Sequence, residues 1–259
     1  SPRWLVSKMR DEKAMRSLML TRSEIEAKME MQTIKHSLRG TSTNWRELIN
    51  PKIMTPFIIA ISITILNQFT GINTFLQYAP NMLQESGMHS QIISMFGAMI
   101  IGGMNFICTV IAIGLVDRIG RRPLLITGTL GVGLTELFMA ITSSTHVQHP
   151  WLQLAGLISF IVFFAIGPGV VVWLAISELL PTHIRSKGMA VCLFFSSLSG
   201  TLLASVFPML VEKIHLSGLY FLCSAFTAVY FWIAVKYLPE TKAQQLEDIQ
   251  QNFTQMQAK

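Results

Sequence analysis

Residues 92–116 read IISMFGAMIIGGMNFICTVIAIGLV, an apolar run in which no side chain is charged. A helix of about 20 apolar residues crosses the hydrocarbon core of a bilayer, which is roughly 30 Å thick. This run therefore predicts a transmembrane helix. The charged sequence DRIGRRP follows at 117–123, so the predicted helix ends in a polar connection.

Runs of the same kind recur on both sides of this stretch. The whole chain is 51% hydrophobic and 13% charged, whereas soluble domains carry about 25% charged residues. We therefore predict an all-α membrane protein with six transmembrane helices. The predicted spans cover residues 55–80, 92–116, 124–144, 151–180, 189–211 and 219–238.

Polar segments flank the predicted bundle. Residues 1–52 interleave charged side chains with Ile and Met, a pattern typical of short amphipathic helices at the cytoplasmic membrane surface. A flexible charged linker is the alternative for that segment. Residues 53–238 form the predicted six-helix transmembrane domain, and residues 239–259 form a cytoplasmic tail that is polar and Gln-rich.

The distribution of basic residues predicts the orientation. Of the 20 Lys and Arg residues, only Lys213 lies in a connection on the side opposite to all the others. Short basic loops mark the cytoplasmic face of a membrane protein. Both termini are therefore predicted to be cytoplasmic, in a plasma membrane or a bacterial inner membrane. The net charge of +6 is explained by topology, and nucleic acid is not a predicted partner.

Reactive side chains do not form a catalytic pattern. Cys108, Cys192 and Cys223 fall inside predicted spans without a CxxC pair, and the six His residues lack metal-ligand spacing. No nucleophile stands in a recognisable pattern with a base. We expect a protein that is not an enzyme and uses no cofactor or metal.

The first predicted span carries amides where lipid would favour apolar side chains. The sequence NQFTGIN occupies 67–73. Polar groups inside a span are costly and usually face a cavity or a neighbouring helix. In a straight helix Asn67 and Tyr78 share one face, Gln68 lies beside that face, and Asn73 lies off it.

Gly71 would let this helix bend or unwind and so change where Asn73 lies. Amides both donate and accept hydrogen bonds, which suits a neutral ligand with many hydroxyl groups. Hydrogen bonding between helices is the alternative role for any single amide.

Two other spans contain unusual residues. Asn105 lies in the middle of the second span, and the sequence Gly167-Pro168-Gly169 interrupts the fourth. Pro168 removes a backbone donor, and such an interruption is tolerated only where it is buried or lines a cavity. Trp173 follows it and offers a flat apolar face with one indole donor. A packing or lipid-facing role is the alternative for Trp173.

Acidic and basic side chains mix at the predicted inner ends of the spans. Acids contribute little to orientation, so Glu178 and Glu240 indicate a network that joins helix ends and closes the cytoplasmic side. Charges that only set the topology are the alternative. The proposed gate network comprises Asp117, Arg118, Arg121, Arg122, Glu178, Arg185 and Glu240.

Glu136 lies well inside the third span. It could bind a proton or pair with a second half, or point into the bundle as a neutral, hydrogen-bonded acid.

Five short motifs in this order resemble the second half of the sugar porter family of the major facilitator superfamily. They are SPRWL at 1–5, NQFTGIN at 67–73, DRIGRR at 117–122, GPG at 167–169 with Trp173, Glu178 and Arg185 behind it, and PETK at 239–242. The resemblance implies half of a twelve-helix fold, with the substrate bound between two six-helix halves. An N-terminal six-helix half is then a required partner.

This resemblance also implies the activity. It predicts movement of a small sugar, a hexose or a pentose, by alternating access, with proton symport as one possible mode. An inactive truncated gene product and a non-transporting sugar sensor are the alternatives. The substrate-binding residues it implies are Asn67, Gln68, Asn73, Tyr78, Asn105 and Trp173.

The chain departs from the family pattern at several positions. Asn67 stands where a glutamine is usual, Gln77 where a tyrosine is usual, and Ala165 where a glutamate is usual. Ser196 and Ser197 replace an Asn-Trp pair that contacts substrate. These changes alter the pocket, so the identity of the sugar does not follow from the resemblance.

Overall fold

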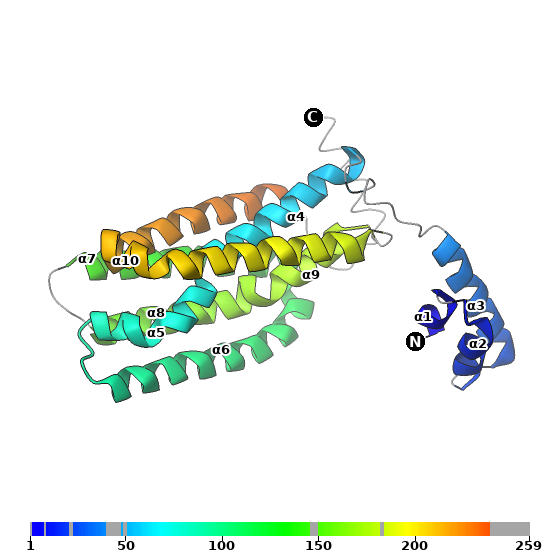
Figure 1. The fold of residues 1–259 in the computed structure, drawn as a ribbon, viewed down its shortest axis with the longest axis horizontal. Coiled ribbons are helices and arrows are strands. Elements are labelled where there is room, and N and C mark those ends of the chain that lie inside the picture. The colour runs from blue at the N-terminus through cyan, green and yellow to red at the C-terminus, as the bar shows by residue number, and fades with distance from the viewer. Residues whose placement is uncertain are drawn as a thin grey trace.

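The chain is almost entirely helical. The computed structural model describes residues 2–7, 9–20, 23–39, 48, 51–145, 150–181 and 184–238, and this part contains no strand. A long bundle of antiparallel helices occupies most of it (Figure 1). The helices are α1 (Pro2–Ser7), α2 (Asp11–Met19), α3 (Glu24–Arg39), α4 (Pro51–Phe69), α5 (Ile72–Glu85), α6 (Gln91–Ile119), α7 (Arg121–Ser144), α8 (Pro150–Phe164), the π-helical turn η2 (Ala165–Gly169), α9 (Val170–Leu179) and α10 (Arg185–Tyr237).

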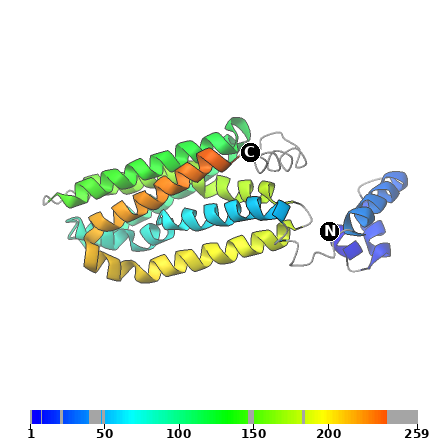
Figure 2. The ribbon, with the colours of Figure 1, turned by 90° about the horizontal axis from the view of Figure 1, so that it is seen from above.

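The last two predicted spans are joined in α10. As a straight helix, its 53 residues would be about 80 Å long, more than twice the roughly 30 Å of a bilayer core. The backbone reverses at His215, where φ is 57° and ψ is 173°. Figure 2 shows the two legs, yellow and orange, running in opposite directions from this turn. The described residues thus hold five long apolar helices, and the reversal in α10 confirms six passes.

The first span breaks where the sequence predicted it. Gly71 adopts φ +83°, a left-handed conformation that separates α4 from α5. Backbone hydrogen bonds are kept on both sides of the break, where Gly71 N–H donates to the Gln68 carbonyl and Phe75 N–H donates to the Gly71 carbonyl. Thr70 Oγ1 donates to the Asn67 carbonyl over 2.8 Å. These contacts satisfy part of the backbone at the bend, which lies in the apolar interior.

The fourth span continues through its Gly-Pro-Gly sequence. The interruption predicted at 167–169 takes the form of the π-helical turn η2, which adds a residue to one turn without unwinding the helix. A Cβ atom at Gly128 of α7 would lie 2.6 Å from Gly167 Cα, so the two backbones touch here. Small residues on both helices permit this close approach.

Two apolar cores fill the bundle, one above the other along its axis. The basal core, nearer the α6–α7 connection, forms around Ile63, Val172, Ile176 and Tyr230. The distal core, nearer the other end of the bundle, forms around Phe75. The rings of Phe160 and Tyr220 lie 5.1 Å and 5.4 Å from the Phe75 ring. Between the two cores, α4, α7 and α10 carry buried polar residues, and the η2 turn lies within the fourth span. This polar layer comprises Asn67, Gln68, Thr70, Thr129, Ser196, Ser199, Thr227 and the η2 turn.

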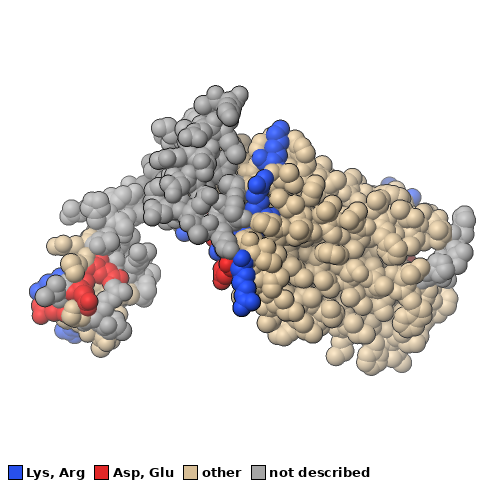
Figure 3. Space-filling model, turned by 180° about the vertical axis from the view of Figure 1, so that it is seen from behind, with Lys and Arg blue, Asp and Glu red and all other residues tan. Residues whose placement is uncertain are grey.

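The bundle surface is mostly apolar, whereas the surface of a soluble protein carries many charged side chains. Large apolar side chains such as Phe96, Met99 and Phe106 are exposed along α6. Figure 3 shows Lys and Arg side chains gathered as a band at one end of the bundle, with only a few charged atoms visible at the opposite end. That end, the basic end of the bundle, holds the α6–α7 connection and the two ends of α10. An apolar barrel with charge at one end fits a membrane setting.

The N-terminal segment forms three short helices with a small core of their own. Val6, Ala14, Leu18, Ala27 and Met31 make up that core. The start of α3 is capped by Ser23, whose Oγ donates to Glu26 Oε2 over 2.8 Å and accepts from Glu26 N–H. The helices expected in this segment are confirmed, and their position at a membrane surface stays a prediction. Residues 239–259 lie outside the described part of the chain.

The left-handed conformation of Gly71 can be tested with alanine. Gly71→Ala should lower the free energy of unfolding by about 1–2 kcal/mol, because a Cβ is disfavoured at this φ. The new Cβ would also lie 2.9 Å from the Phe75 ring. Gly102→Ala is the matched control, since nothing lies within 4 Å of its Cβ position. Unfolding in detergent micelles measures both, and equal stability of the two variants would contradict the role of Gly71.

Candidate functional site

The break at Gly71 brings three polar side chains into one relay. Asn73 Nδ2 donates to Gln68 Oε1 over 2.7 Å, and Gln68 Nε2 donates to Ser196 Oγ over 2.7 Å. Gln68 and Ser196 are buried, whereas Asn73 is exposed. The relay therefore runs from the interior of the bundle to an amide on its surface, where Asn73 Oδ1 can accept a hydrogen bond.

Ser196 and Gly200 belong to this site although neither was among the predicted binding residues; Ser196 had been noted only as a departure from the family pattern. Both lie on the first leg of α10, one turn apart, and Ala204 lies a further turn along. A Cβ at Gly200 would lie 3.1 Å from Gln68 Oε1. Small residues at every fourth position let the amides approach this leg closely. That spacing was the available signal in the sequence.

The other predicted binding residues lie apart from the relay. Asn67 is 4% exposed, and its Oδ1 has no hydrogen-bond partner among the described residues. The Tyr78 ring stacks on Phe207 with centroids 4.4 Å apart, and its hydroxyl donates to the Ala204 carbonyl over 3.5 Å. Asn105 is half-buried on α6, and half-buried Trp173 packs against the basal core. Of the six predicted residues, the described hydrogen bonds join Gln68 and Asn73.

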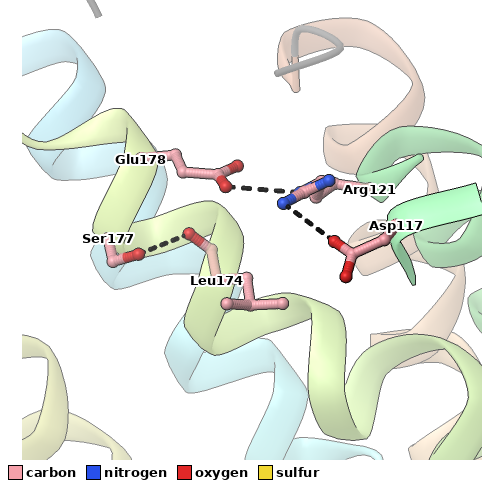
Figure 4. A network of polar contacts seen from close by, with 5 residues as sticks. All are labelled: Asp117, Arg121, Leu174, Ser177 and Glu178. Carbon is pink, nitrogen blue, oxygen red and sulfur yellow. Dashed lines mark hydrogen bonds and ion pairs between the residues drawn. The ribbon is translucent and has the colours of Figure 1, made fainter. Parts of the chain in front are cut away.

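Charged side chains meet at the basic end of the bundle. Arg121, at the start of α7, donates from Nε to Glu178 Oε1 of α9 over 3.2 Å. Arg121 also lies 3.6 Å from Asp117 Oδ1 of α6 (Figure 4). The Arg121 and Glu178 side chains are 17% and 25% exposed, while Asp117 is 80% exposed. One guanidinium thus joins the ends of three helices.

Two of the predicted network arginines bind backbone carbonyls in addition. Arg122 Nη2 donates to the Val235 carbonyl over 2.8 Å, and Arg185 Nε donates to the Leu180 carbonyl over 3.3 Å. Both carbonyls lie at the C-terminal ends of helices, which carry a partial negative charge. In these two contacts the acceptor that joins the helix ends is a backbone carbonyl rather than a carboxylate. Glu240 lies outside the described residues.

Glu136 points into the bundle. It is 0% exposed, on the face of α7 that meets the second leg of α10, and it lies close to Thr227 without a hydrogen bond between them. Glu136 is fully buried within this chain. The prediction that it pairs with another half across the bundle surface is therefore wrong. The interior position was one of the alternatives that the sequence left open.

The chain belongs to a family of membrane transporters. The model of the family described as "Sugar (and other) transporter" matches residues 1–253, and the helical bundle with its apolar surface agrees with that membership.

Known relatives make the likeness more specific. The chain is 32% identical to the major myo-inositol transporter IolT of Bacillus subtilis (strain 168), over 98% of this chain and 55% of the relative. It is 31% identical to the D-xylose-proton symporter of Escherichia coli (strain K12), over 96% and 52%. The structure of the proton:xylose symporter XylE bound to 6-bromo-6-deoxy-D-glucose matches with a TM-score of 0.78 and 30% identity, over 98% and 54%. The chain spans about half the length of these relatives.

The contact between Arg121 and Glu178 can be measured with a double-mutant cycle. Arg121→Gln and Glu178→Gln should show a coupling energy of about 1 kcal/mol, because the pair is mostly buried and bonded by a guanidinium. Unfolding in micelles at low and high salt measures the coupling. The Asp117–Arg121 pair is the control, and its exposed carboxylate should give a coupling near zero. Equal coupling in both pairs would contradict the structural difference between them.

Proposed function

We propose that this chain is the C-terminal six-helix half of a sugar carrier that works by alternating access. One observation carries the proposal: the relay from Ser196 through Gln68 ends at an exposed amide, Asn73, in the middle of an apolar span. Exposed polar groups at membrane depth face water or another protein surface, since lipid cannot satisfy them. A water-filled cavity against a second six-helix half meets that requirement.

The chemistry of the relay suits a neutral sugar. Each amide can donate and accept at once, as a hydroxyl can, so a sugar can replace water with no charge to neutralise. Asn105 on α6 and Trp173 on α9 would add a polar contact and a flat surface from other helices. Tyr78 and Asn67 belong to the same proposed site. The names of the relatives, which include glucose, xylose and myo-inositol transporters, support a small polyhydroxyl substrate.

The basic end supplies the proposed cytoplasmic gate. Arg121 joins α6, α7 and α9 there. The remaining members Arg118, Arg122, Arg185 and Glu240 belong to the same proposed network, although Glu240 lies outside the described residues. This network would hold helix ends together while the inner side is closed and would separate when it opens. A coupling energy of zero between Arg121 and Glu178 would remove the physical basis of that gate.

The proposed site is tested by alanine substitution in a transporter assembled from this chain and a first six-helix half of the same family. Gln68→Ala and Asn105→Ala should each weaken sugar affinity by about 2- to 12-fold, the effect of losing one neutral hydrogen bond. Equilibrium binding and uptake in proteoliposomes measure the effect. Gln91→Ala, an exposed amide at the start of α6, is the matched control. Unchanged affinity in both site variants would show that these amides only form hydrogen bonds between helices and do not bind the sugar.

The proposed orientation places the basic end in the cytoplasm. Cysteines introduced at His89 and Ile119 lie at opposite ends of α6, and both positions are exposed. The native cysteines are buried, so they give little background labelling. A membrane-impermeant maleimide added to sealed cells should label position 89 and spare position 119. The reverse pattern would overturn the orientation.

A further inference from the structure

A pocket separate from the relay lies at the end of the bundle opposite the basic end. It is a cavity of about 450 Å³ between α5 and the turn of α10, within the range of roughly 300–1,000 Å³ that small-molecule sites occupy. No proposed binding residue other than Tyr78 lines it. The side chains that matter here are Tyr78, Asn81, Glu85, Phe207, Glu212 and His215.

The polar groups of this pocket are open to a ligand. In the described part of the chain, no hydrogen bond or ion pair involves the side chain of Asn81, Glu85 or Glu212, and all three are exposed. The two carboxylates are strong acceptors, Asn81 both donates and accepts, and His215 adds a further nitrogen. The pocket is therefore rich in acceptors and calls for a ligand that is rich in donors, such as a polyol.

One side of the pocket is apolar. The stacked rings of Tyr78 and Phe207 form its floor, and Pro208 and Val211 continue that wall along α10. A pyranose ring has hydroxyl groups around its edge and C–H groups on its faces, so it can use an apolar wall and a rim of carboxylates together.

A row of polar side chains connects this pocket to the relay. Asn73, Gln77, Asn81 and Glu85 stand at every fourth position of α5, and all four are exposed. Residues four apart share a helix face, and each step advances about 6 Å along the axis. The row therefore runs about 18 Å, from the amide that bonds Gln68 to the carboxylate in the pocket. A span that needed only to meet lipid would carry apolar residues at these positions.

We propose that the α5–α10 pocket is a second sugar-binding site, which holds a monosaccharide at the mouth of the bundle before it passes along this row to the relay. The inference rests on the proposed carrier function. A metal ion fits the pocket less well, because no group of three or more His, Cys, Asp or Glu side chains in the described residues is arranged to hold one. An organic cation is the competing ligand, since two carboxylates line the pocket.

The 259-residue chain in lipid nanodiscs tests the site directly, because every lining residue belongs to this chain. D-glucose binding is followed by saturation-transfer NMR and by calorimetry. Glu212→Gln keeps the side-chain size and removes the charge, and it should weaken D-glucose affinity about tenfold, the effect of losing a charge-assisted hydrogen bond. Asn81→Ala should weaken binding in the same direction. Glu12→Gln, the same change at an exposed acid of α2 outside the bundle, should leave the affinity at the wild-type value.

The outcomes separate this site from the carrier proposal. If Glu212→Gln and Asn81→Ala bind D-glucose as the wild type does while their circular dichroism is unchanged, the pocket is not a sugar site. Binding of tetramethylammonium in place of D-glucose, lost in Glu212→Gln, would overturn the proposal in favour of a cation. If the two variants weaken D-glucose binding to the isolated chain but the assembled transporter shows no uptake, the pocket stands and the carrier function fails. If Gln68→Ala alone abolishes all binding, the relay is the sole site and the pocket proposal is wrong.

Discussion

Inside a bilayer, every backbone N–H and C=O group has to find its partner within the protein. This constraint decides where the helices can bend. At Gly71 the bend keeps some of its hydrogen bonds, which involve Gln68, Phe75 and the Thr70 hydroxyl. At Gly167 the chain keeps them by widening one turn into a π-helix, pressed against the glycines of α7. Polar side chains then gather where the backbone is irregular, and the candidate site is built there.

The sequence was most informative where a single helix determines the outcome. Length and hydropathy predicted six passes, and Gly71 and 167–169 marked both irregular turns correctly. The form of the second was not predictable, because a π-helical turn depends on how closely α7 can approach. The turn of α10 falls inside the predicted connection at 212–218, but the sequence did not single out His215, whose φ is 57°, as the residue that makes it.

Contacts between helices were predicted less well, for a physical reason. Which face of a span meets its neighbour depends on the rotation of both helices, and an apolar pattern all round a helix leaves that rotation open. The contacts of Ser196 and Gly200 with Gln68 were therefore not predicted, although Gln68 itself was identified. The arginines Arg122 and Arg185 were expected near carboxylates, and they bind the carbonyls of helix ends, which any sequence supplies. Glu136 was recognised as unusual, but its direction could only come from the packed bundle.

The division of the interior into a basal and a distal core has a mechanical consequence. Each core is a close-packed block that resists deformation, while the polar layer between them contains both irregular turns and fewer apolar contacts. Such a layer forms a seam that deforms more easily than the close-packed cores on either side of it. If one core tilts against the other, atoms far from the seam travel the greatest distance and atoms within it travel the least. Gln68 and Ser196 lie in that seam, so the relay stays together while the two ends of the bundle swing.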